Sequence, residues 1–412
     1  MFDKSYLLPR EALPRLLDAL PGSSPGIERI SLEESYGRVV ASVIISPEDL
    51  PGFSRSTVDG YAVNASDTFG ARETSPAYLT LDGEVFMGEA PSLNLLRGQA
   101  AKIPTGGMLP GGADAVVMLE YVNPVSEAMI EVLRSVAPHE NVIARGEDVR
   151  CGERVLSMGH RLRPQDVGAL AGLGITEVEV FRRPVVAIIS TGDEIVPAHS
   201  PAGPGQVRDI NSFTLWGMIR RHGGVPVKKG IIADDYMRLK EVIDGSLNDS
   251  DIVLISGGTS AGVKDMTFAL INEAGEPGVL FHGVALKPGK PMIGGVVGGR
   301  AVLGLPGHPA AVAVCFDLFI RPLIEKLGGV VPGHGVEKTV KATMAKTIAS
   351  AAGREDHIRV SIEVMGEDVR ATPVLGKSGL ITTLVKADGV VVIPSGKLGL
   401  DAGEEVTVRL FE

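Results

Sequence analysis

The stretch from Asp251 to Asp265 carries the groups that a phosphate-binding turn needs. A short apolar run, residues 252–255, is typical of a strand buried on both faces. It is followed by glycines and small hydroxyl residues, namely Ser256, Gly257, Gly258, Thr259 and Ser260. A glycine turn that leads into a helix directs backbone N–H groups and the positive end of the helix dipole at an anion. Since Asp265 would repel a phosphate, it is better suited to a divalent cation, a water or a substrate amine or hydroxyl.

A lone Gly-Gly pair is as often an ordinary turn, so the neighbouring strand ends matter. Residues 185–189 and 225–232 are further predicted strands that end in polar groups, and the first of them is an apolar run. These groups are Thr191, Gly192, Asp193 and Glu194 after the first run, and Asp234 and Asp235 after the second. Strands that alternate with helices predict a parallel α/β sheet, which binds ligands beyond the carboxyl ends of its strands. Three polar strand ends at one edge therefore predict a site, and Asn211 or Ser212 is expected to cap the next helix.

Residues 287–291, Lys-Pro-Gly-Lys-Pro, supply positive charge for an anionic ligand. The prolines stiffen a loop that holds Lys287 and Lys290 close together, and an ammonium group suits a compact oxyanion as a point charge. A solvated surface loop is the alternative interpretation, but this loop lies between apolar runs. The next predicted strand ends in Gly-Leu-Pro-Gly-His-Pro. There His308 is a ligand, a proton carrier or simply a polar cap of the following helix.

The composition limits the functional class. The chain has 412 residues, of which 44% are hydrophobic and 22% charged, and a net charge of −10. This length predicts roughly two to four domains. The negative charge argues against a general nucleic-acid binder, which needs a basic face. Cys151 and Cys315 show neither zinc spacing nor a disulfide framework, which fits the reducing cytoplasm, and we expect no signal peptide or membrane span.

The other stretches predict the surrounding elements. Residues 5–20 have the spacing of an amphipathic helix, interrupted by Pro14. Residues 51–145 predict strands and turns, with Asp59 in a turn before Gly60. Residues 336–412 predict a compact β-barrel or small sandwich.

The combination of these motifs is more specific than any one of them. The chain resembles the MoeA family of molybdopterin molybdenumtransferases, which includes the gephyrin E-domain. The matching segments run in order through nearly the whole chain: residues 51–62, 104–107, 145–148, 190–194, 230–235, 256–260 with Asp265, 287–291 and 304–309.

The resemblance implies a mixed, multidomain α/β fold. A three-layer α/β domain similar to MoaB and MogA would span residues 181–330, and a β-barrel would span residues 331–412. A small α+β domain would be split between residues 1–50 and 146–180, with a β-rich domain of residues 51–145 inserted in it. The family also implies an elongated homodimer whose active sites are shared between subunits.

The activity implied by the resemblance is insertion of molybdate, or tungstate, into adenylylated molybdopterin, with Mg²⁺-dependent release of AMP. The adenylyltransferase that makes this substrate and the apo-molybdoenzymes would be further partners. By position, Glu194, Asp235 and Asp265 would act in catalysis and hold the metal, while Asp59 and Asp148 would reach the site from the second subunit. The implied substrate-binding residues are Thr105, Thr191, Gly192, Asp193, Asn211, Ser256, Gly257, Gly258, Thr259, Ser260, Pro306, Gly307 and His308. The implied oxyanion residues are Lys287, Lys290, Pro291, Arg359 and Thr382, with Ser378 as the alternative to Thr382.

The chain departs from the family pattern at His308, where asparagine is common, and at Ala310-Ala311, where a serine is expected. These departures leave open which groups bind the oxyanion, and whether it is molybdate or tungstate. Two other functions are alternatives, and the first shares the Ser-Gly-Gly turn. One is an enzyme that adenylylates molybdopterin, which would not need domains like residues 51–180 and 331–412. The other is a non-catalytic molybdopterin-binding scaffold, for which we would expect an additional domain or linker.

Overall fold

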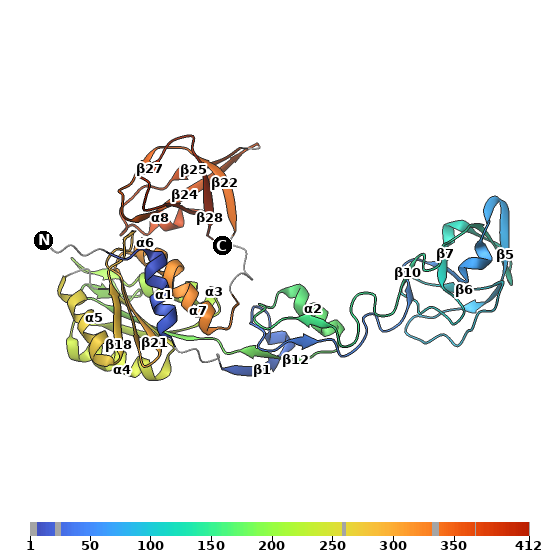
Figure 1. The fold of residues 1–412 in the computed structure, drawn as a ribbon, viewed down its shortest axis with the longest axis horizontal. Coiled ribbons are helices and arrows are strands. Elements are labelled where there is room, and N and C mark those ends of the chain that lie inside the picture. Colours follow the sequence, from blue (N-terminus) through green and yellow to red (C-terminus); the bar gives the residue numbers. More distant parts are fainter. Residues whose placement is uncertain (1–5, 21–25, 258–260, 332–337, 367, 412) are drawn as a thin grey trace.

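The computed structural model describes residues 6–20, 26–257, 261–331, 338–366 and 368–411. Figure 1 shows an elongated molecule, in which two bodies stand at one end and a β-rich lobe lies at the other. We name its parts the α/β body (residues 9–19 and 185–327), the barrel (339–410), the small unit (27–45 and 154–181) and the far lobe (55–143).

The α/β body is built on a six-stranded sheet of order β16-β13-β17-β21-β20-β18, which confirms the predicted α/β fold. Its strands are β13 (Val185–Thr191), β16 (Val225–Ile232), β17 (Ile252–Gly257), β18 (Pro277–His282), β20 (Ile293–Val297) and β21 (Arg300–Leu305). The first four strands in this order are parallel, and β20 and β18 extend the sheet in antiparallel pairing. Because β16 and β17 flank β13 on opposite sides, the strand order changes direction between β13 and β17.

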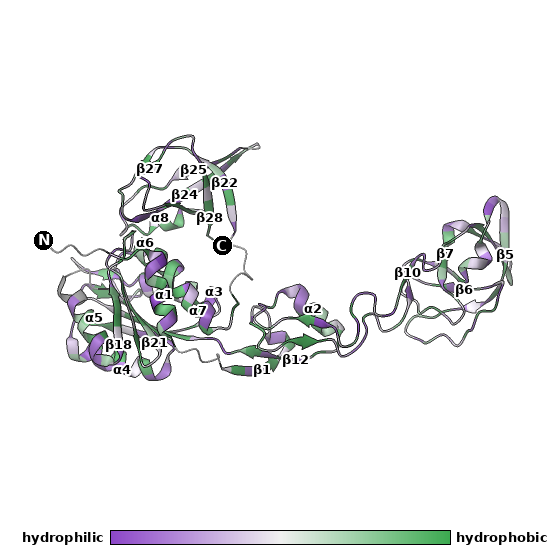
Figure 2. Ribbon diagram, in the orientation of Figure 1, coloured by the Kyte–Doolittle hydropathy of each residue, from purple (hydrophilic) through white to green (hydrophobic). Residues whose placement is uncertain are grey.

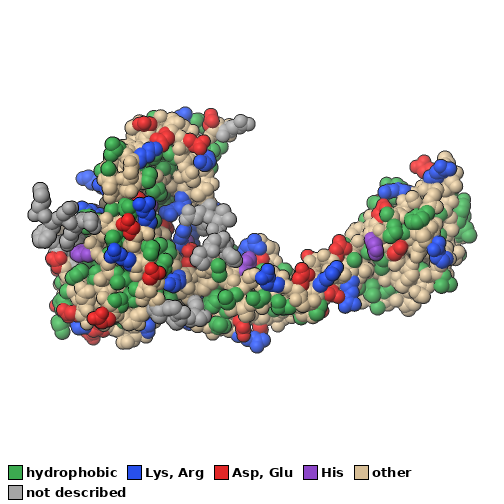
Figure 3. Space-filling model, in the orientation of Figure 1, with side chains coloured by type: hydrophobic (Ala, Val, Ile, Leu, Met, Phe, Trp, Pro, Cys, Tyr) green, Lys and Arg blue, Asp and Glu red, His purple; other side chains and the backbone are tan. Residues whose placement is uncertain are grey.

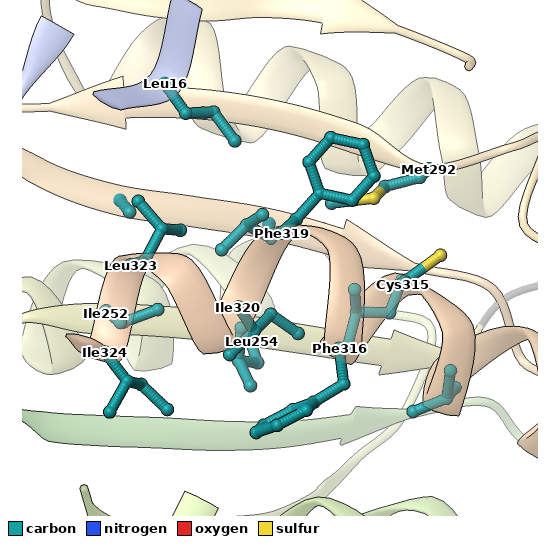
Figure 4. Close-up of a cluster of buried hydrophobic side chains, with 14 of the residues drawn as sticks. Leu16, Ile252, Leu254, Met292, Cys315, Phe316, Phe319, Ile320, Leu323 and Ile324 are labelled. Carbon is teal, nitrogen blue, oxygen red and sulfur yellow. The ribbon is translucent and has the colours of Figure 1, made fainter. Parts of the chain in front are cut away.

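Helices cover both faces of this sheet, because its strands are apolar on both sides. They are α1 (Pro9–Ala19), α3 (Asn211–Arg221), α6 (Pro309–Cys315) and α7 (Arg321–Leu327) on one face, and α4 (Tyr236–Asp249) and α5 (Ala261–Ala274) on the other. Figure 4 shows Ile320 and Ile324 lying against Leu254 and Ile252 of β17 in the first of these layers. In Figure 2, β18 and β21 are hydrophobic along much of their length, whereas α1 and α4 also carry hydrophilic residues.

Helix α1 packs on the α/β body, whereas the sequence assigned residues 1–50 to the small split domain. Ala12, Leu16 and Leu20 are buried in the main core of the α/β body. Pro14 lies inside the helix, as expected. An amphipathic stripe shows that a helix is buried on one side, but it does not show which sheet it covers. The other predicted domain boundaries stay a prediction.

The small unit joins an early and a late segment of the chain. Strand β1 (Ile27–Ser31) pairs with β12 (Glu177–Phe181), and β2 (Ile44–Ile45) pairs with β11 (Arg154–Leu156), both antiparallel. Helix α2 (Pro164–Gly172) has a proline at its first position and covers their shared core.

The far lobe is a six-stranded sheet of order β7-β4-β6-β5-β9-β8. Its strands are β4 (Gly60–Val63), β5 (Arg72–Glu84), β6 (Gln99–Ile103), β7 (Ala115–Met118), β8 (Val122–Ser126) and β9 (Met129–Arg134). The pair of β3 (Arg55–Ser56) and β10 (Val142–Ile143) connects it to the small unit.

The barrel closes because β24 pairs with both β25 and β26. Its strands are β22 (Thr339–Met344), β24 (Glu355–Met365), β25 (Asp368–Pro373), β26 (Gly389–Ile393) and β28 (Glu405–Leu410). The short strand β19 (Leu286–Lys287), which comes from the α/β body, pairs in parallel with β24. The predicted lysine loop and the barrel therefore share one sheet.

Charges are mixed over the surface. Figure 3 shows acidic and basic side chains interspersed over the face in view. Anion binding on this face therefore depends on local arrangement. None of the described helices is long and apolar enough to span a membrane.

Candidate active site

The ends of β13 and β17 meet at the point where the strand order changes direction. Gly257 has a φ of +145°, and a Cβ there would lie 1.7 Å from the carbonyl oxygen of Thr191. Gly192 has the same φ, and a Cβ there would lie 2.7 Å from the carboxylate of Glu194. Both positions therefore favour glycine, and at Gly257 the backbones of β17 and β13 approach too closely for any side chain.

Hydrogen bonds fix the polar groups at this edge. Thr191 Oγ1 donates to Asp234 Oδ1 at 2.8 Å, and the backbone N–H of Asp234 donates to Asp193 Oδ1 at 3.1 Å. Ser190 Oγ donates to Asp209 Oδ2 at 2.8 Å. The ends of β13 and β16 are thereby tied together. Asp209 is a residue of this edge that the sequence did not single out.

Asn211 connects β17 to the turn after β21. Its Nδ2 donates to Ser256 Oγ at 3.0 Å and to the carbonyl of Gly307 at 2.9 Å. It does not cap α3, as one sequence alternative had it, because the cap residue is Ile210. Asn211 Oδ1 is buried without a hydrogen-bond partner among the described residues. Buried amide oxygens are normally satisfied, so a donor group of a ligand would fit this position.

The three predicted metal-binding carboxylates lie on separate elements that follow β13, β16 and β17. Asp235 caps α4, since its Oδ1 accepts from the backbone N–H of Arg238 at 2.9 Å. Glu194 and Asp265 are exposed, Asp265 within α5. Within the described ranges, no three His, Cys, Asp or Glu side chains are close enough to hold a metal ion. The predicted turn residues Gly258, Thr259 and Ser260 lie outside the described residues.

A cleft of about 800 Å³ lies between the α/β body and the barrel. Six of the residues that line it were predicted from the sequence to bind substrate or oxyanion, namely Lys287, Lys290, Pro291, Pro306, Gly307 and His308. Ser378, the alternative to Thr382, lines it as well, and the structure adds Tyr6 and Arg354. The lysine loop and the Pro-Gly-His turn are therefore brought together, in a cavity large enough for an organic ligand.

Each lysine of the loop has a partner. Lys290 Nζ lies 4.6 Å from the centre of the Tyr6 ring, which is a cation–π distance. Lys287 Nζ lies 3.5 Å from Asp356 Oδ2, in barrel strand β24. Arg354 binds the same carboxylate with two donors, Nε at 2.7 Å and Nη2 at 3.3 Å.

Ser378, and not Thr382, provides the barrel hydroxyl at the cleft. Ser378 Oγ and His308 Nδ1 form a hydrogen bond of 2.8 Å, whereas Thr382 is exposed and does not line the cleft. Arg359 does not line it either. Burial lowers the pKa of its guanidinium, and its Nη2 donates to the carbonyl of Gly376 at 3.5 Å. Arg359 thus contacts the segment that carries Ser378 instead of facing the cleft.

In the far lobe, Asp59 and Thr105 form a pair. The backbone N–H and Oγ1 of Thr105 donate to Asp59 Oδ1 at 2.7 and 2.9 Å. These bonds lower the pKa of Asp59, which keeps it ionised at neutral pH. Asp148 is exposed, and its N–H donates to the carbonyl of Leu50. In Figure 1 the small unit separates the far lobe from the α/β body, so Asp59 does not reach Asp265 within one chain.

Three side chains beside the lysine loop were not singled out from the sequence, because they lie far from the loop along the chain. Tyr6, Arg354 and Asp356 belong to no motif, and only the packing of the barrel and the N-terminal segment brings them to the loop. One signal was available. The alternating apolar pattern of residues 355–365 places Asp356 at a position that a barrel would bury, and a charge there calls for a partner.

Three family models match the chain. The MoeA N-terminal region (domain I and II) matches residues 8–174, the "Probable molybdopterin binding domain" matches residues 187–326, and the MoeA C-terminal region (domain IV) matches residues 341–411.

Relatives and solved structures agree with these matches. A Haemophilus influenzae protein named molybdopterin molybdenumtransferase is 33% identical over 97% of this chain and 98% of its own length. A Methanocaldococcus jannaschii protein named for molybdopterin biosynthesis is 37% identical over 94% of this chain and 92% of its own length. The crystal structure of a molybdopterin biosynthesis MoeA protein from Pyrococcus horikoshii has a TM-score of 0.86 and 36% identity, and it covers 98% of this chain and 100% of that one. The chain therefore belongs to the MoeA family of molybdopterin molybdenumtransferases, enzymes of molybdenum cofactor biosynthesis.

Proposed function

We propose that the protein inserts molybdate into adenylylated molybdopterin and releases AMP in a Mg²⁺-dependent step. The observation that carries this proposal is the cleft between the α/β body and the barrel. It gathers two lysines beside the Pro-Gly-His turn, in a protein whose net charge is −10. Such a local concentration of positive charge supports an anion site, since the chain as a whole would repel anions.

Molybdate is the substrate that we assign to the lysine loop. Lys287 and Lys290 supply ammonium donors, and the hydrogen-bonded pair of His308 and Ser378 supplies further polar groups. These side chains would bind and orient the oxyanion beside the dithiolene that receives the metal. Tungstate has the same charge and nearly the same size, so it would bind the same groups.

We assign the adenylate to the edge where β13 and β17 end. Gly192 and Gly257 keep side chains away from the backbone there, and Asn211 Oδ1 would accept a hydrogen bond from the ligand. Open α/β sheets bind nucleotides at such a change in strand direction. Thr191, Asp193 and the turn that begins at Ser256 would complete this half of the site.

The carboxylates at the same edge suit Mg²⁺, which commonly takes only one or two protein carboxylates together with substrate phosphates. The dispersed placement of Glu194, Asp235 and Asp265 therefore fits an ion that binds with the substrate. When bound, Mg²⁺ would supply positive charge that stabilises the departing phosphate. One or two of Glu194, Asp235 and Asp265 would hold it together with the substrate phosphate.

A second subunit would complete the cleft. Asp59 and Asp148 match family motifs, but the far lobe does not reach the cleft within one chain. We therefore propose a cytoplasmic homodimer in which the far lobe of each subunit faces the cleft of the other. It would act after the enzyme that adenylylates molybdopterin and before the apo-molybdoenzymes.

AMP release from adenylylated molybdopterin, measured with and without molybdate and Mg²⁺, tests the proposal. We expect AMP release that needs Mg²⁺ and is accompanied by insertion of molybdenum. A scaffold would bind the substrate without releasing AMP. An adenylyltransferase would instead form the adenylylated compound from ATP and molybdopterin, and either result would refute the proposal.

A further inference from the structure

The lysine loop is anchored to the barrel at its first residue. Strand β19 pairs with β24 so that Leu286 lies opposite Glu355 and Lys287 lies opposite Asp356. The backbone N–H of Glu355 donates to the carbonyl of Ala285 at 2.9 Å. The barrel therefore presents the side chains around Asp356 directly to one of the two lysines assigned to the oxyanion.

Asp356 is a fully buried carboxylate, with 0% of its side chain exposed, that lies between two cations. One is Lys287, whose side chain is 56% exposed, and the other is Arg354, which is 36% exposed. Ionised carboxylates are rarely buried unless they are paired. Asp356 therefore holds the ammonium group of Lys287 and the guanidinium group of Arg354 in place, while both side chains remain partly exposed at the cleft.

Arg354 has donors left for a ligand. Its Nε and one N–H of Nη2 bind Asp356, out of the five N–H groups that a guanidinium carries. Arg354 also lines the cleft, together with Lys287 and Lys290. Its planar group can offer two parallel N–H donors to two oxygen atoms of an oxyanion, whereas a lysine ammonium acts as a point charge.

We propose that Arg354 is a third cation of the oxyanion site, and that Asp356 is the positioning residue that orients Arg354 and Lys287 toward the bound anion. The three cations and one carboxylate leave two positive charges, which match a doubly charged tetrahedral oxyanion such as molybdate or tungstate. This inference rests on the proposed function, because it assigns the cleft to the oxyanion.

Binding of molybdate to the full-length protein, measured by isothermal titration, tests the role of Arg354. Perrhenate, a tetrahedral oxyanion with a single charge, serves as the comparison. Arg354→Gln should weaken molybdate binding roughly ten- to a hundredfold, the loss expected for a charge-assisted hydrogen bond, and should weaken perrhenate binding less. A molybdate affinity that stays within about twofold of the original protein would overturn the assignment.

The variant Asp356→Asn distinguishes a positioning role from a purely electrostatic one, because the two roles predict opposite changes in molybdate affinity. If Asp356 only reduces the positive charge, Asp356→Asn should tighten molybdate binding. If it positions the two cations, the same change should weaken binding by roughly tenfold, because the cations lose their common anchor. Tighter binding would therefore overturn the positioning role.

The double variant Arg354→Gln/Asp356→Asn removes one charge of each sign, so the net charge of the cleft stays the same. It also leaves no unpaired buried carboxylate, which protects the fold if either single variant is unstable. We expect it to bind molybdate as weakly as Arg354→Gln does. Binding equal to that of the original protein would show that only net charge matters, against our inference.

Two further variants separate a failure of this inference from a failure of the proposed function. Arg370→Gln removes one exposed arginine of the barrel that does not line the cleft, and it should leave binding unchanged. Lys290→Ala tests the cleft itself. If Lys290→Ala weakens molybdate binding and Arg354→Gln does not, only the present inference is wrong. If neither variant weakens it, the oxyanion binds elsewhere and both proposals fail.

Discussion

The cleft and the far lobe differ in how completely they are assembled within one chain. Around the cleft, residues from the N-terminal segment, the α/β body and the barrel already contact one another, as in the pairs Tyr6–Lys290 and His308–Ser378. In the far lobe, Asp59 contacts Thr105 but no residue of the α/β body. The comparison separates groups that one chain orients before ligands arrive from groups that would act only after two chains meet.

This difference bears on catalysis. A preassembled set of cations binds its ligand without the cost of ordering its side chains. Carboxylates supplied by a second chain can instead close the site around a substrate that is already bound. We therefore expect changes at the cleft to alter binding in each subunit, and changes in the far lobe to alter activity only through the dimer.

The largest expected effect is that of Asp265→Asn. If Asp265 holds Mg²⁺ or positions water at the phosphate, its loss should reduce the rate of AMP release by about 10² or more, with fold and dimer unchanged. The rate of AMP release in a single turnover measures this effect. Asp244→Asn, a change of another aspartate on the neighbouring helix α4, is the matched control. Near-normal turnover of Asp265→Asn would remove this residue from the chemistry.

The next effect concerns Lys290. Lys290→Ala should raise the molybdate concentration needed for half-maximal insertion roughly ten- to a hundredfold, because a charge-assisted contact is lost. Tungstate should lose affinity in parallel, and AMP binding should change much less. Lys341→Ala, an exposed lysine of the barrel paired with Glu405, is the control. If Lys290→Ala weakens AMP binding and leaves the molybdate dependence intact, the two anion sites have been interchanged.

A mixing experiment tests the far lobe directly. Asp59→Asn and Asp265→Asn subunits should each be inactive, but a heterodimer would contain one cleft with both aspartates intact. After random exchange of equal amounts, we expect about a quarter of the original activity, since half of the dimers are mixed and each has one working site. Native mass spectrometry would verify that subunits exchange. Activity no higher than that of the parents, in a sample that has exchanged, would mean that the site is not shared.

The smallest effect concerns the pH dependence of barrel stability. Burial, with a smaller contribution from Arg409, lowers the pKa of His357 to about 4, and Asp356 opposes this shift. In the folded protein His357 takes up a proton only near pH 4, whereas in the unfolded chain it does so near pH 6.5. The free energy of unfolding therefore falls as the pH drops from about 6.5 toward 4, and at pH 5 it is about 2 kcal/mol lower than at pH 7. His357→Leu should remove this dependence, seen as a shift of a few degrees in melting temperature between pH 7 and pH 5. If the melting temperature of the original protein and that of His357→Leu change equally between pH 7 and pH 5, His357 does not cause the dependence.

The parts of the fold that sequence reasoning found are those encoded locally. The parallel strands of the α/β body were predicted from the alternation of strand and helix patterns, and residues 225–232 form β16 with the expected bounds. The antiparallel strands β18 and β20 were given no bounds. The lysine loop was recognised because two prolines and two lysines lie within five residues. Both signals need no knowledge of the rest of the chain.

The parts that it missed depend on contacts between distant segments. Arg354 and Asp356 reach the cleft only because β24 pairs with β19, a parallel pairing that no local pattern encodes. Thr382 was preferred to Ser378 for a similar reason, since both are hydroxyl residues near a turn and only the docking of the barrel brings Ser378 to His308. Which of the two binds the oxyanion stays a prediction. Asn211 or Ser212 was expected to cap a helix because both residue types favour that position, but the cap is Ile210 and the Asn211 side chain bonds Ser256 and Gly307.

The shared sheet of β19 and β24 has a consequence for biosynthesis of the protein. Domains generally fold in order as the chain leaves the ribosome, and β24 is made well after the strands of the α/β body are complete. Until then the backbone of β19 lacks its partner strand, and Lys287 has no carboxylate beside it. A nascent or truncated chain that ends before the barrel would therefore carry a folded α/β sheet beside half a cleft, in which Lys287 lacks Asp356 and Arg354 is missing.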